Sequence, residues 1–328
     1  MNKIINIGVM GCAAIADRSV IPAILSLPQC FKLVAVASRN VDKAREFADR
    51  FGCEAVIGYD TLLNRQDIQA IYMPLPTGLH KKWINEALSK GKHVYAEKSI
   101  AMNYADASQM VEKAENFDIA LMEGFMFQYH SQHQVVFEIL NSGEIGEVRH
   151  FASKFGFPPL ETGNFRYDND IGGGALLDAA GYVVRSAHFI LGDSFKVESA
   201  TMKLDANTGA SLWGTAFMCD GSGVGASLSF GFDNFYQCSY EIWGSEGKLT
   251  ADRAFTPRFD FKPKIIVETK KGSRIIEAAA DNQFVKAMKE FYGIISGKSE
   301  KQKHFGEILL QSKSLDRIMK YSLENEKQ

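Results

Sequence analysis

The stretch that decides the fold lies near the start of the chain and reads IINIGVMGCAAIA over residues 4–16. Its apolar run, Ile4–Val9, predicts a buried strand, and the following residues fit the GxGxxG/A pattern of a turn that opens a helix. Gly11 permits the tight turn, and small residues after it let the backbone approach a pyrophosphate at the helix N-terminus. Ala13 stands in the second glycine position, where its methyl group would crowd a ligand. A Gly/Ala-rich turn between any strand and helix would look the same, so the neighbouring segments must decide.

Up to about residue 123 the chain alternates between short β-rich runs and helical patterns. The predicted strands are Ile4–Val9, Phe31–Ser38, Ala55–Ile57, Ala70–Pro74, Lys92–Glu97 and Ala120–Glu123. The predicted helices are Arg18–Leu27, Val41–Phe51, Thr61–Asn64, Lys81–Lys90 and Tyr104–Glu115. This order is typical of parallel βαβ units. We therefore predict an α/β protein in which residues 1–122 form a Rossmann domain with a parallel sheet that binds a dinucleotide.

The pattern changes after residue 123. Helices are predicted over Gln132–Ser142, Ala175–Leu191, Asn282–Ser296 and Phe305–Leu323, and a strand over Glu147–Phe157. The segment from Lys196 to Glu277 is rich in strands that are separated by Gly- and Asp-containing turns, which favours a mostly antiparallel sheet. Residues 123–328 are thus predicted to form an α+β domain with a large open sheet, which serves substrate binding and oligomerisation.

Composition restricts the class of protein. The 328 residues are 46% hydrophobic, which suffices for two packed domains, and 37 Lys and Arg against 39 Asp and Glu leave a net charge of −2. The basic residues are scattered, so we expect no nucleic-acid or membrane partner. Five cysteines without a CxxC pair favour reduced thiols and a cytoplasmic location over a disulfide framework or a zinc site. No run approaches the ~20 apolar residues of a membrane-spanning helix.

The end of the second predicted strand bears on the choice of cofactor. An NAD site usually has an Asp or Glu here that binds the ribose 2′-hydroxyl, whereas this chain has Ser38 and Arg39. A hydroxyl and a guanidinium suit a 2′-phosphate, which favours NADP(H) over NAD(H). The alternative is a solvated arginine at the start of a helix.

Three further segments carry a resemblance to a known family. They are residues 75–80 (LPTGLH), residues 95–99 (YAEKS) and residues 172–182 (GGGALLDAAGY). With the first turn, they resemble the glucose–fructose oxidoreductase / inositol dehydrogenase family over nearly the whole chain, although Ser99 replaces the proline of that family's Glu-Lys-Pro motif. Together with the turn and the strand end, the resemblance predicts cofactor contacts at Gly11, Cys12, Ala13, Ala14, Ile15, Ser38, Arg39, Leu75, Pro76, Thr77, His80, Glu97 and Lys98. His80 alternatively caps the helix predicted from Lys81.

Lys98 is also a candidate on physical grounds. It follows a predicted parallel strand at the sheet edge where open α/β sheets bind ligands. Hydride transfer to a ketone leaves an alkoxide, and a nearby ammonium stabilises that charge and lowers the pKa of a proton donor. The alternative is a surface lysine. With the resemblance, Lys98 is predicted to be catalytic.

Tyr182 is the candidate proton donor. If Ala175–Leu191 is helical, Asp178, Tyr182 and Arg185 share one stripe opposite an apolar face. Periodicity alone favours a stripe that faces water. The resemblance reverses this preference, because the family places an Asp and a catalytic His or Tyr at these two positions.

A closer similarity comes from local features at residues 155–159 (FGFPP), 164–166 (NFR), 182–185 (YVVR) and 281–285 (DNQFV). These are similar to the NDP-hexose 3-ketoreductases of the family, which make deoxysugar precursors. The resemblance implies NADPH-dependent reduction of a keto group on a sugar, linked to a nucleotide and of the keto-deoxyhexose type. Tyr129, Arg166, Asp178 and Arg185 become candidate substrate contacts, although either arginine would also serve as a structural salt-bridge partner. We expect no metal, because His130 and His133 lack a suitably spaced third ligand.

Other functions remain open at this point. The same residues would serve a sugar, polyol or dihydrodiol dehydrogenase working oxidatively. An NAD-dependent glycoside hydrolase on the same scaffold is another alternative, against which Ser38 and Arg39 argue, and a non-catalytic dinucleotide sensor is a third. The resemblance further implies a homodimer or homotetramer that pairs through the second-domain sheet, whose predicted strands include Ser227–Phe235 and Tyr240–Trp243.

Overall fold

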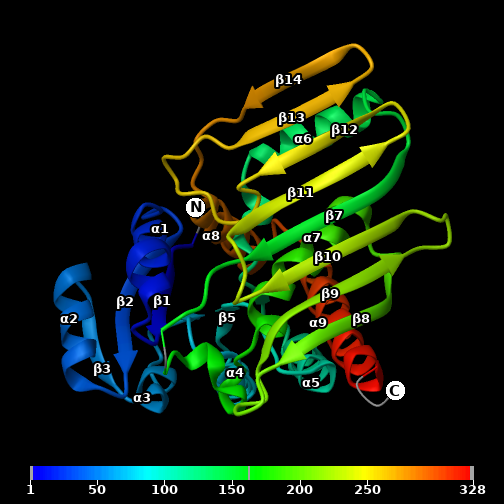
Figure 1. The fold of residues 1–328 in the computed structure, drawn as a ribbon. Helices are drawn as coiled ribbons and strands as arrows, with labels where there is room; N and C mark the ends of the chain where they lie inside the picture. The colour runs from blue at the N-terminus through cyan, green and yellow to red at the C-terminus, as the bar shows by residue number, and fades with distance from the viewer. Residues whose placement is uncertain (1–2, 162, 326–328) are drawn as a thin grey trace. The chain divides into compact units, whose positions relative to one another are not determined.

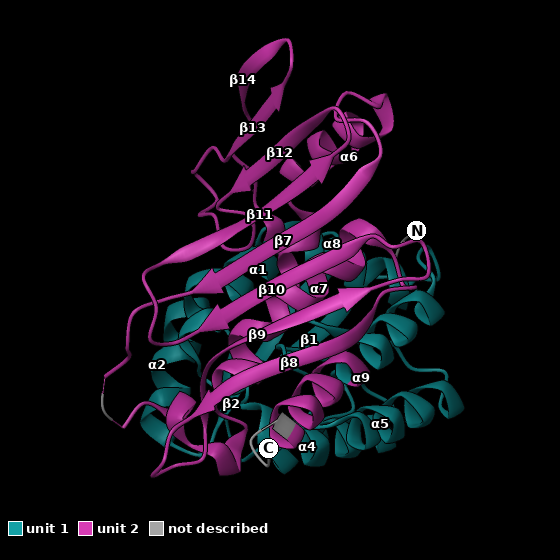
Figure 2. Cartoon of the chain, turned by 45° about the vertical axis from the view of Figure 1, so that its right-hand side comes forward, with its two compact units in different colours: residues 1–124, 284–312 teal, residues 125–283, 313–328 magenta. Residues whose placement is uncertain are grey.

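The computed structural model describes residues 3–161 and 163–325, which form two compact units (Figure 2). Unit 1 runs to Gly124 and takes in Phe284–Ser312, and unit 2 comprises Phe125–Gln283 and the residues from Lys313. Unit 1 thus includes α8 (Gln283–Ile295), apart from its first residue, and the first part of α9 (Lys301–Asn325), although both follow the second sheet in the sequence. The division into functional domains at residues 122 and 123 stays a prediction.

Unit 1 is a Rossmann unit, as predicted. Its six strands lie in the order β3-β2-β1-β4-β5-β6, and all neighbouring pairs are parallel. Strands β1, β2, β3 and β5 are labelled in Figure 1. The strands are β1 (Ile5–Met10), β2 (Phe31–Ser38), β3 (Glu54–Ile57), β4 (Ala70–Met73), β5 (His93–Ala96) and β6 (Leu121–Glu123). The helical segments are η1 (Ala16–Val20), α1 (Ile21–Leu25), α2 (Val41–Phe51), α3 (Tyr59–Leu63), α4 (Thr77–Ser89) and α5 (Tyr104–Asn116). Because strand order reverses beside β1, the carboxyl ends of β1 and β4 form the edge where such sheets bind ligands.

Three helix starts in unit 1 differ from the prediction, and one of them is that of α3, which begins at Tyr59 rather than at Thr61. The first helical segment opens with the π-helical turn η1 at Ala16 rather than at Arg18, and α4 begins at Thr77 rather than at Lys81. Pro76, with φ −58°, precedes α4 and pre-sets the backbone for its first turn. The apolar periodicity that located this helix in the sequence begins only later, at Trp83 and Ile84.

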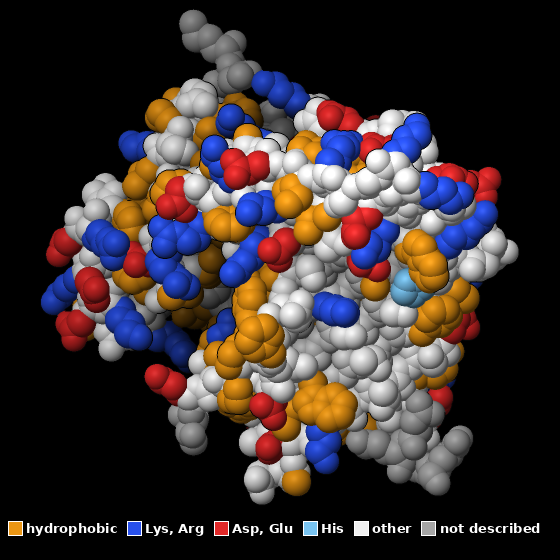
Figure 3. Space-filling model, turned by 45° about the horizontal axis from the view of Figure 1, so that its top comes forward, with side chains coloured by type: hydrophobic (Ala, Val, Ile, Leu, Met, Phe, Trp, Pro, Cys, Tyr) orange, Lys and Arg blue, Asp and Glu red, His pale blue; other side chains and the backbone are white. Residues whose placement is uncertain are grey.

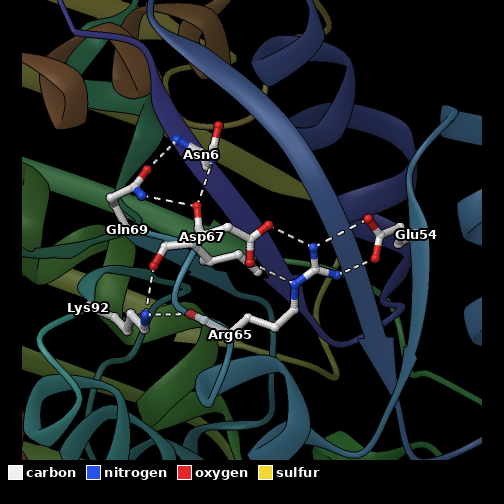
Figure 4. Close-up of polar contacts among 7 residues, drawn as sticks. Asn6, Glu54, Arg65, Asp67, Gln69 and Lys92 are labelled. Carbon is white, nitrogen blue, oxygen red and sulfur yellow. Dashed lines mark hydrogen bonds and ion pairs between the residues drawn. The ribbon is translucent and has the colours of Figure 1, made fainter.

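At the amino ends of the unit 1 strands, polar side chains form hydrogen bonds and ion pairs with one another and with nearby backbone carbonyls (Figure 4). Arg65 pairs with Glu54 at 2.5 Å and with Asp67 at 2.8 Å. Buried Lys92 donates to the carbonyls of Arg65 and Ile68 at 2.8 and 2.7 Å, and burial lowers its pKa. These contacts satisfy the groups at this edge. A ligand site is therefore expected at the opposite, carboxyl edge.

Unit 2 is built on an eight-stranded sheet in the order β14-β13-β12-β11-β7-β10-β9-β8. All pairs are antiparallel except β7 with β10, so the prediction of a mostly antiparallel sheet is confirmed. The strands are β7 (Val148–Gly156), β8 (Lys196–Leu204), β9 (Ser211–Cys219), β10 (Gly225–Gly231), β11 (Gln237–Gly244), β12 (Gly247–Asp252), β13 (Lys264–Thr269) and β14 (Gly272–Glu277). The helical segments are η2 (Met126–Tyr129), α6 (Gln132–Ser142), η3 (Phe165–Tyr167), η4 (Asn169–Ile171), η5 (Leu176–Ala180) and α7 (Gly181–Leu191).

The two faces of this sheet differ. Helices α6 and α7 lie over one face, where alternate residues of the strands are buried (Figure 1). The other face carries exposed aromatic side chains at Trp213, Phe217 and Trp243. This alternation is what a half-buried antiparallel sheet requires.

Surface charge agrees with the composition. Figure 3 shows basic and acidic side chains mixed on the face that it presents. Within the described residues, no helix combines the length and apolar character needed to cross a bilayer. All five cysteines have free thiols.

Three buried histidines and half-buried His93 make stability depend on pH. Burial lowers the pKa of His80, His93 and His188 to about 4 and that of His133 to about 3. Below the ordinary value of 6.5 the unfolded chain therefore takes up protons that the folded chain refuses, so stability is lost as the pH falls. The expected loss is roughly 2 kcal/mol per histidine between pH 6.5 and 5. Urea midpoints measured at pH 7, 6 and 5 should fall steadily, and an unchanged midpoint over this range would contradict the prediction.

Candidate active site

The turn after β1 is shaped for close approach of a ligand. Gly11 has φ +120°, its N–H donates to the Ala37 carbonyl at 2.9 Å, and a Cβ on it would come within 2.9 Å of Leu75 Cδ2. Only glycine fits this position without strain. The structure thus brings this turn against Leu75, which follows β4 and leads into Pro76 and Thr77. The predicted contacts at the carboxyl ends of β1 and β4 lie together, and this cradle fits a dinucleotide pyrophosphate.

The residues after Gly11 line the start of the first helical segment. Cys12, Ala13 and Ile15 are half-buried, and Ala14 is exposed. The Cys12 thiol contacts the Lys43 carbonyl at 3.6 Å, and burial raises its pKa to about 11. A thiol in this state is neutral at physiological pH and a poor nucleophile. Its position therefore suits packing beside a ligand.

Ser38 and Arg39 occupy the end of β2. The buried Ser38 hydroxyl accepts from the Asn40 N–H at 3.1 Å, and the Asn40 side chain caps α2 by accepting from the Lys43 N–H at 3.0 Å. Arg39 is exposed and lies beside the hydroxyl of Tyr59. The first carboxylate after this strand is Asp42, inside α2. The strand end therefore presents a guanidinium where an NAD site presents an acid.

Glu97 and Lys98 follow β5 at the same sheet edge. The hydroxyl of wholly buried Tyr72, on the neighbouring strand β4, donates to Glu97 Oε1 at 2.8 Å. Burial, reinforced by the Glu97 charge, holds the pKa of Tyr72 well above its usual value, so this hydroxyl remains a donor. Glu97 N–H donates to the Met73 carbonyl at 3.1 Å. Half-buried Lys98 is thereby attached to a backbone anchored on β4, and its peptide bond to Ser99 is cis.

His80 does not cap α4. It lies inside the first turns of that helix with no exposed surface, and its Nδ1 contacts the Ser99 carbonyl at 3.1 Å. Burial keeps the ring neutral at physiological pH, since its pKa falls to about 4. His80 therefore contacts the backbone directly after Lys98.

Tyr182 lies in unit 2 at the start of α7, directly after the π-helical turn η5. Only 6% of it is exposed, and its hydroxyl lies 3.8 Å from Met126 Sδ. Four phenylalanine rings surround it, with centroids 4.8 to 6.0 Å from its own: Phe155, Phe125, Phe255 and Phe127. We call these four residues the aromatic cage. The stripe that periodicity assigned to solvent is thus buried at Tyr182 and, with 4% exposure, at Arg185.

Asp178, one turn before Tyr182, binds Arg166 from a distant loop. Arg166 Nε donates to Asp178 Oδ2 at 2.5 Å, and its guanidinium stacks on Phe165. A glycine turn holds this loop: Gly174 N–H donates to the Arg166 carbonyl at 2.7 Å, and a Cβ on Gly173 would meet that carbonyl at 2.6 Å. The salt-bridge alternative for Arg166 is therefore what the structure shows.

Arg185 contacts the segment η2, which also contains Tyr129. Arg185 Nε donates to Gln128 Oε1 at 3.1 Å, and the guanidinium lies over the Phe125 ring. Tyr129, next along the chain from Gln128, is half-buried. Sequence analysis missed Gln128, as it missed Tyr72, because an isolated polar residue in a buried segment carries no periodic signal.

His130 and His133 lie in the packed interior of unit 2. Both are buried, and His133 Nδ1 lies 2.8 Å from the Tyr240 hydroxyl, with the two rings stacked. Burial lowers the His133 pKa to about 3. This geometry describes a packed core residue.

A Rossmann unit with a lysine at its ligand edge, joined to a sheet unit with a caged tyrosine, is typical of dinucleotide-dependent oxidoreductases. Residues 5–125 match the family model described as the oxidoreductase family with an NAD-binding Rossmann fold, and residues 133–250 match the GFO/IDH/MocA C-terminal domain. The chain belongs to this family of oxidoreductases, which confirms the predicted resemblance.

Particular relatives are sugar-nucleotide reductases. The chain is 42% identical over 292 residues to the dTDP-3,4-didehydro-2,6-dideoxy-alpha-D-glucose 3-reductase of Saccharopolyspora spinosa, covering 89% of this chain and 87% of that protein. The Actinomadura kijaniata reductase of the same name is 39% identical, with coverage of 91% and 90%. The crystal structure of KijD10, a 3-ketoreductase from that organism in complex with NADP and TDP-benzene, matches with a TM-score of 0.94 at 37% identity, over 97% of this chain and 98% of that one.

Proposed function

We propose that this protein uses NADPH to reduce a keto group on a nucleotide-linked deoxyhexose, with Tyr182 as proton donor and Lys98 assisting. The observation that carries the proposal is the pair of Lys98 and Tyr182. Solved variants of KijD10 have a lysine and a tyrosine substituted, and these two are separated by the same number of residues as Lys98 and Tyr182. The similarity of this chain to that NADP-bound protein supports the same chemistry here.

In this proposal, side chains of this protein supply the proton that the carbonyl oxygen takes up and stabilise the negative charge that develops there. The nicotinamide, when bound, supplies the hydride that reaches the carbonyl carbon. Tyr182 then gives its phenolic proton to the oxygen, so that a hydroxyl forms and no alkoxide persists. Its cage excludes water from one side of the ring and fixes the ring's direction. The Lys98 ammonium favours negative charge on the oxygens that exchange this proton.

The remaining predicted contacts take supporting roles in the proposal. The turn from Gly11 to Ile15 and the segment from Leu75 to Thr77 hold the pyrophosphate and the nicotinamide side, and His80 and Glu97 position Lys98 through the backbone. Asp178, Arg166, Arg185 and Tyr129 form the wall of the sugar site. We further propose that the enzyme is cytoplasmic and that it pairs with a second copy through the exposed aromatic face of the unit 2 sheet. Light scattering tests the pairing, because the Trp243→Glu variant should lose the dimer.

The function is tested by following NADPH absorbance with a panel of free and dTDP-linked keto sugars and with the corresponding alcohols plus NADP⁺. We expect consumption of NADPH with the nucleotide-linked keto sugar. Turnover only of free sugars or diols with NADP⁺ would establish an oxidative dehydrogenase instead. Purified protein that retains stoichiometric NAD⁺ and cleaves glycosides without net oxidation would establish the glycoside hydrolase, and absence of all turnover would favour a sensor.

Arg39 is expected to select the cofactor. Arg39→Ala removes the guanidinium proposed to bind the 2′-phosphate, so KM for NADPH should rise at least tenfold, whereas KM for NADH should change by less than threefold. Arg45→Ala, another exposed arginine in helix α2, removes the same charge away from the strand end and serves as the control. Equal changes in both KM values would show that Arg39 does not read the phosphate.

A further inference from the structure

Arg253 stands out among the arginines of unit 2. It lies directly after β12, is exposed, and has φ +53°, a conformation that costs free energy for a residue with a side chain. Its guanidinium carbon sits 4.6 Å from the ring centre of Tyr236, which precedes β11. Within the part of the chain that the structure describes, its guanidinium forms no ion pair. The Asp252 carboxylate accepts from the backbone N–H of Arg253 at 2.9 Å, so it is engaged by the backbone and the guanidinium remains available to an anion.

The backbone that carries Arg253 is held by two buried side-chain amides. Gln132 Nε2 donates to the carbonyls of Arg253 and Ala254 at 3.5 and 3.2 Å. Gln283 Nε2 donates to the carbonyls of Phe255 and Pro257 at 3.4 and 3.5 Å. Both glutamines are almost wholly buried. Segment 253–257 is therefore clamped from within, which maintains the strained residue and reduces the entropy that a ligand contact would cost.

This segment adjoins the aromatic cage. Phe255, two residues after Arg253, is a cage member whose ring centre lies 5.7 Å from that of Tyr182. Cys238 of strand β11 pairs with Phe155 of strand β7, another cage member. Tyr236 is two residues before buried Cys238, so its side chain lies on the same face of the sheet. Arg253 and Tyr236 thus extend the cage at the end of the sheet on the face that carries Tyr182.

Other positive groups near the cage are already engaged. Arg166 is paired with the Asp178 carboxylate, and Arg185 is buried against Gln128. A hollow of about 750 Å³ lies beside the Arg166 loop, but three carboxylates on its wall oppose an anion: Asp168, Asp170 and Asp205. The charge distribution therefore leaves Arg253 as the anchor for an anionic substrate group.

We propose that Arg253, stacked on Tyr236, binds the diphosphate of a nucleoside diphosphate sugar and so selects nucleotide-linked over free sugars. The planar guanidinium presents a fork of donors that matches two phosphate oxygens, and the tyrosine ring fixes its plane. The inference rests on the proposed function, because it supplies the site for the charged part of that substrate. It also replaces Arg166 and Arg185 as the expected partner of that charge.

The test compares Arg253→Met with Arg258→Met. Arg258 is five residues further on, exposed, and bonded to Asp260 at 3.1 and 3.2 Å, so its loss is a matched control. Binding of dTDP, thymidine and NADP⁺ is measured by calorimetry. Arg253→Met should weaken dTDP binding at least tenfold and leave thymidine and NADP⁺ unchanged, Arg253→Lys should recover part of the loss, and Arg258→Met should bind dTDP normally.

The outcomes separate the two proposals. If the unmodified protein binds dTDP and Arg253→Met binds it within twofold, the diphosphate site is wrong while the proposed function stands. If the unmodified protein reduces a free keto sugar and does not bind dTDP, the nucleotide part of the function fails and the site with it. A parallel loss of NADP⁺ binding in both Arg253 variants would assign the residue to folding and overturn the site.

Discussion

Replacing Tyr182 by phenylalanine is expected to lower kcat by a factor of about 10²–10⁴ while leaving NADPH affinity within twofold. The substitution removes the phenolic proton and keeps a ring that the aromatic cage accommodates. The hydroxyl lies 3.8 Å from Met126 Sδ, and the ring contacts with the cage are retained in the variant, so folding should be nearly unaffected. Single-turnover oxidation of NADPH measures the chemical step directly.

Tyr167→Phe provides the matched control. That residue carries the same hydroxyl in unit 2, on the loop of Arg166, where it accepts from the Leu160 N–H at 2.9 Å. Its variant should retain the kcat of the unmodified enzyme. A Tyr182→Phe enzyme that turns over within threefold of normal would remove Tyr182 from the mechanism.

Replacing Lys98 by methionine is the second large effect, with kcat expected to fall about 10²–10³-fold and KM for NADPH to change much less. The methionine keeps an unbranched side chain that is one atom shorter and removes the charge that stabilises the developing negative oxygen. The backbone beneath it, tied to β4 and to His80, should keep its place, because those contacts involve Glu97 and Ser99. Stopped-flow measurement of the hydride step separates this effect from cofactor binding.

Two further variants sharpen the result. Lys90→Met removes an exposed lysine at the end of α4 and should behave as the unmodified enzyme. The Lys98→Met, Tyr182→Phe double variant should lose little more than the worse single variant, because both groups serve one proton transfer. Multiplied losses in the double variant would mean that the two residues act on separate steps.

Much of the fold could be predicted because local periodicity specified it. Helix α2 and helix α6 have the predicted ends, and strand β2 agrees residue for residue. The errors concern signals that are not periodic. The start of α4 depends on Pro76, the π-helical turns η1 and η5 depend on tertiary packing, and the place of α8 in unit 1 depends on contacts such as that of Phe291 with Phe31, distant in the sequence.

The sequence by itself determined the Rossmann unit, the glycine turn and the position of Lys98, because each depends on residues that are consecutive in the chain. The turn needs a glycine at φ +120°, and Lys98 directly follows a strand that ends at the ligand-binding edge. Only the tertiary structure decided what covers each side chain. It buried Tyr182 among phenylalanines that come from η2, β7 and the loop after β12, paired Arg166 with Asp178, and left Arg253 on a clamped turn. Periodicity tells which residues of a helix share a face, but the groups that meet that face come from segments far along the chain.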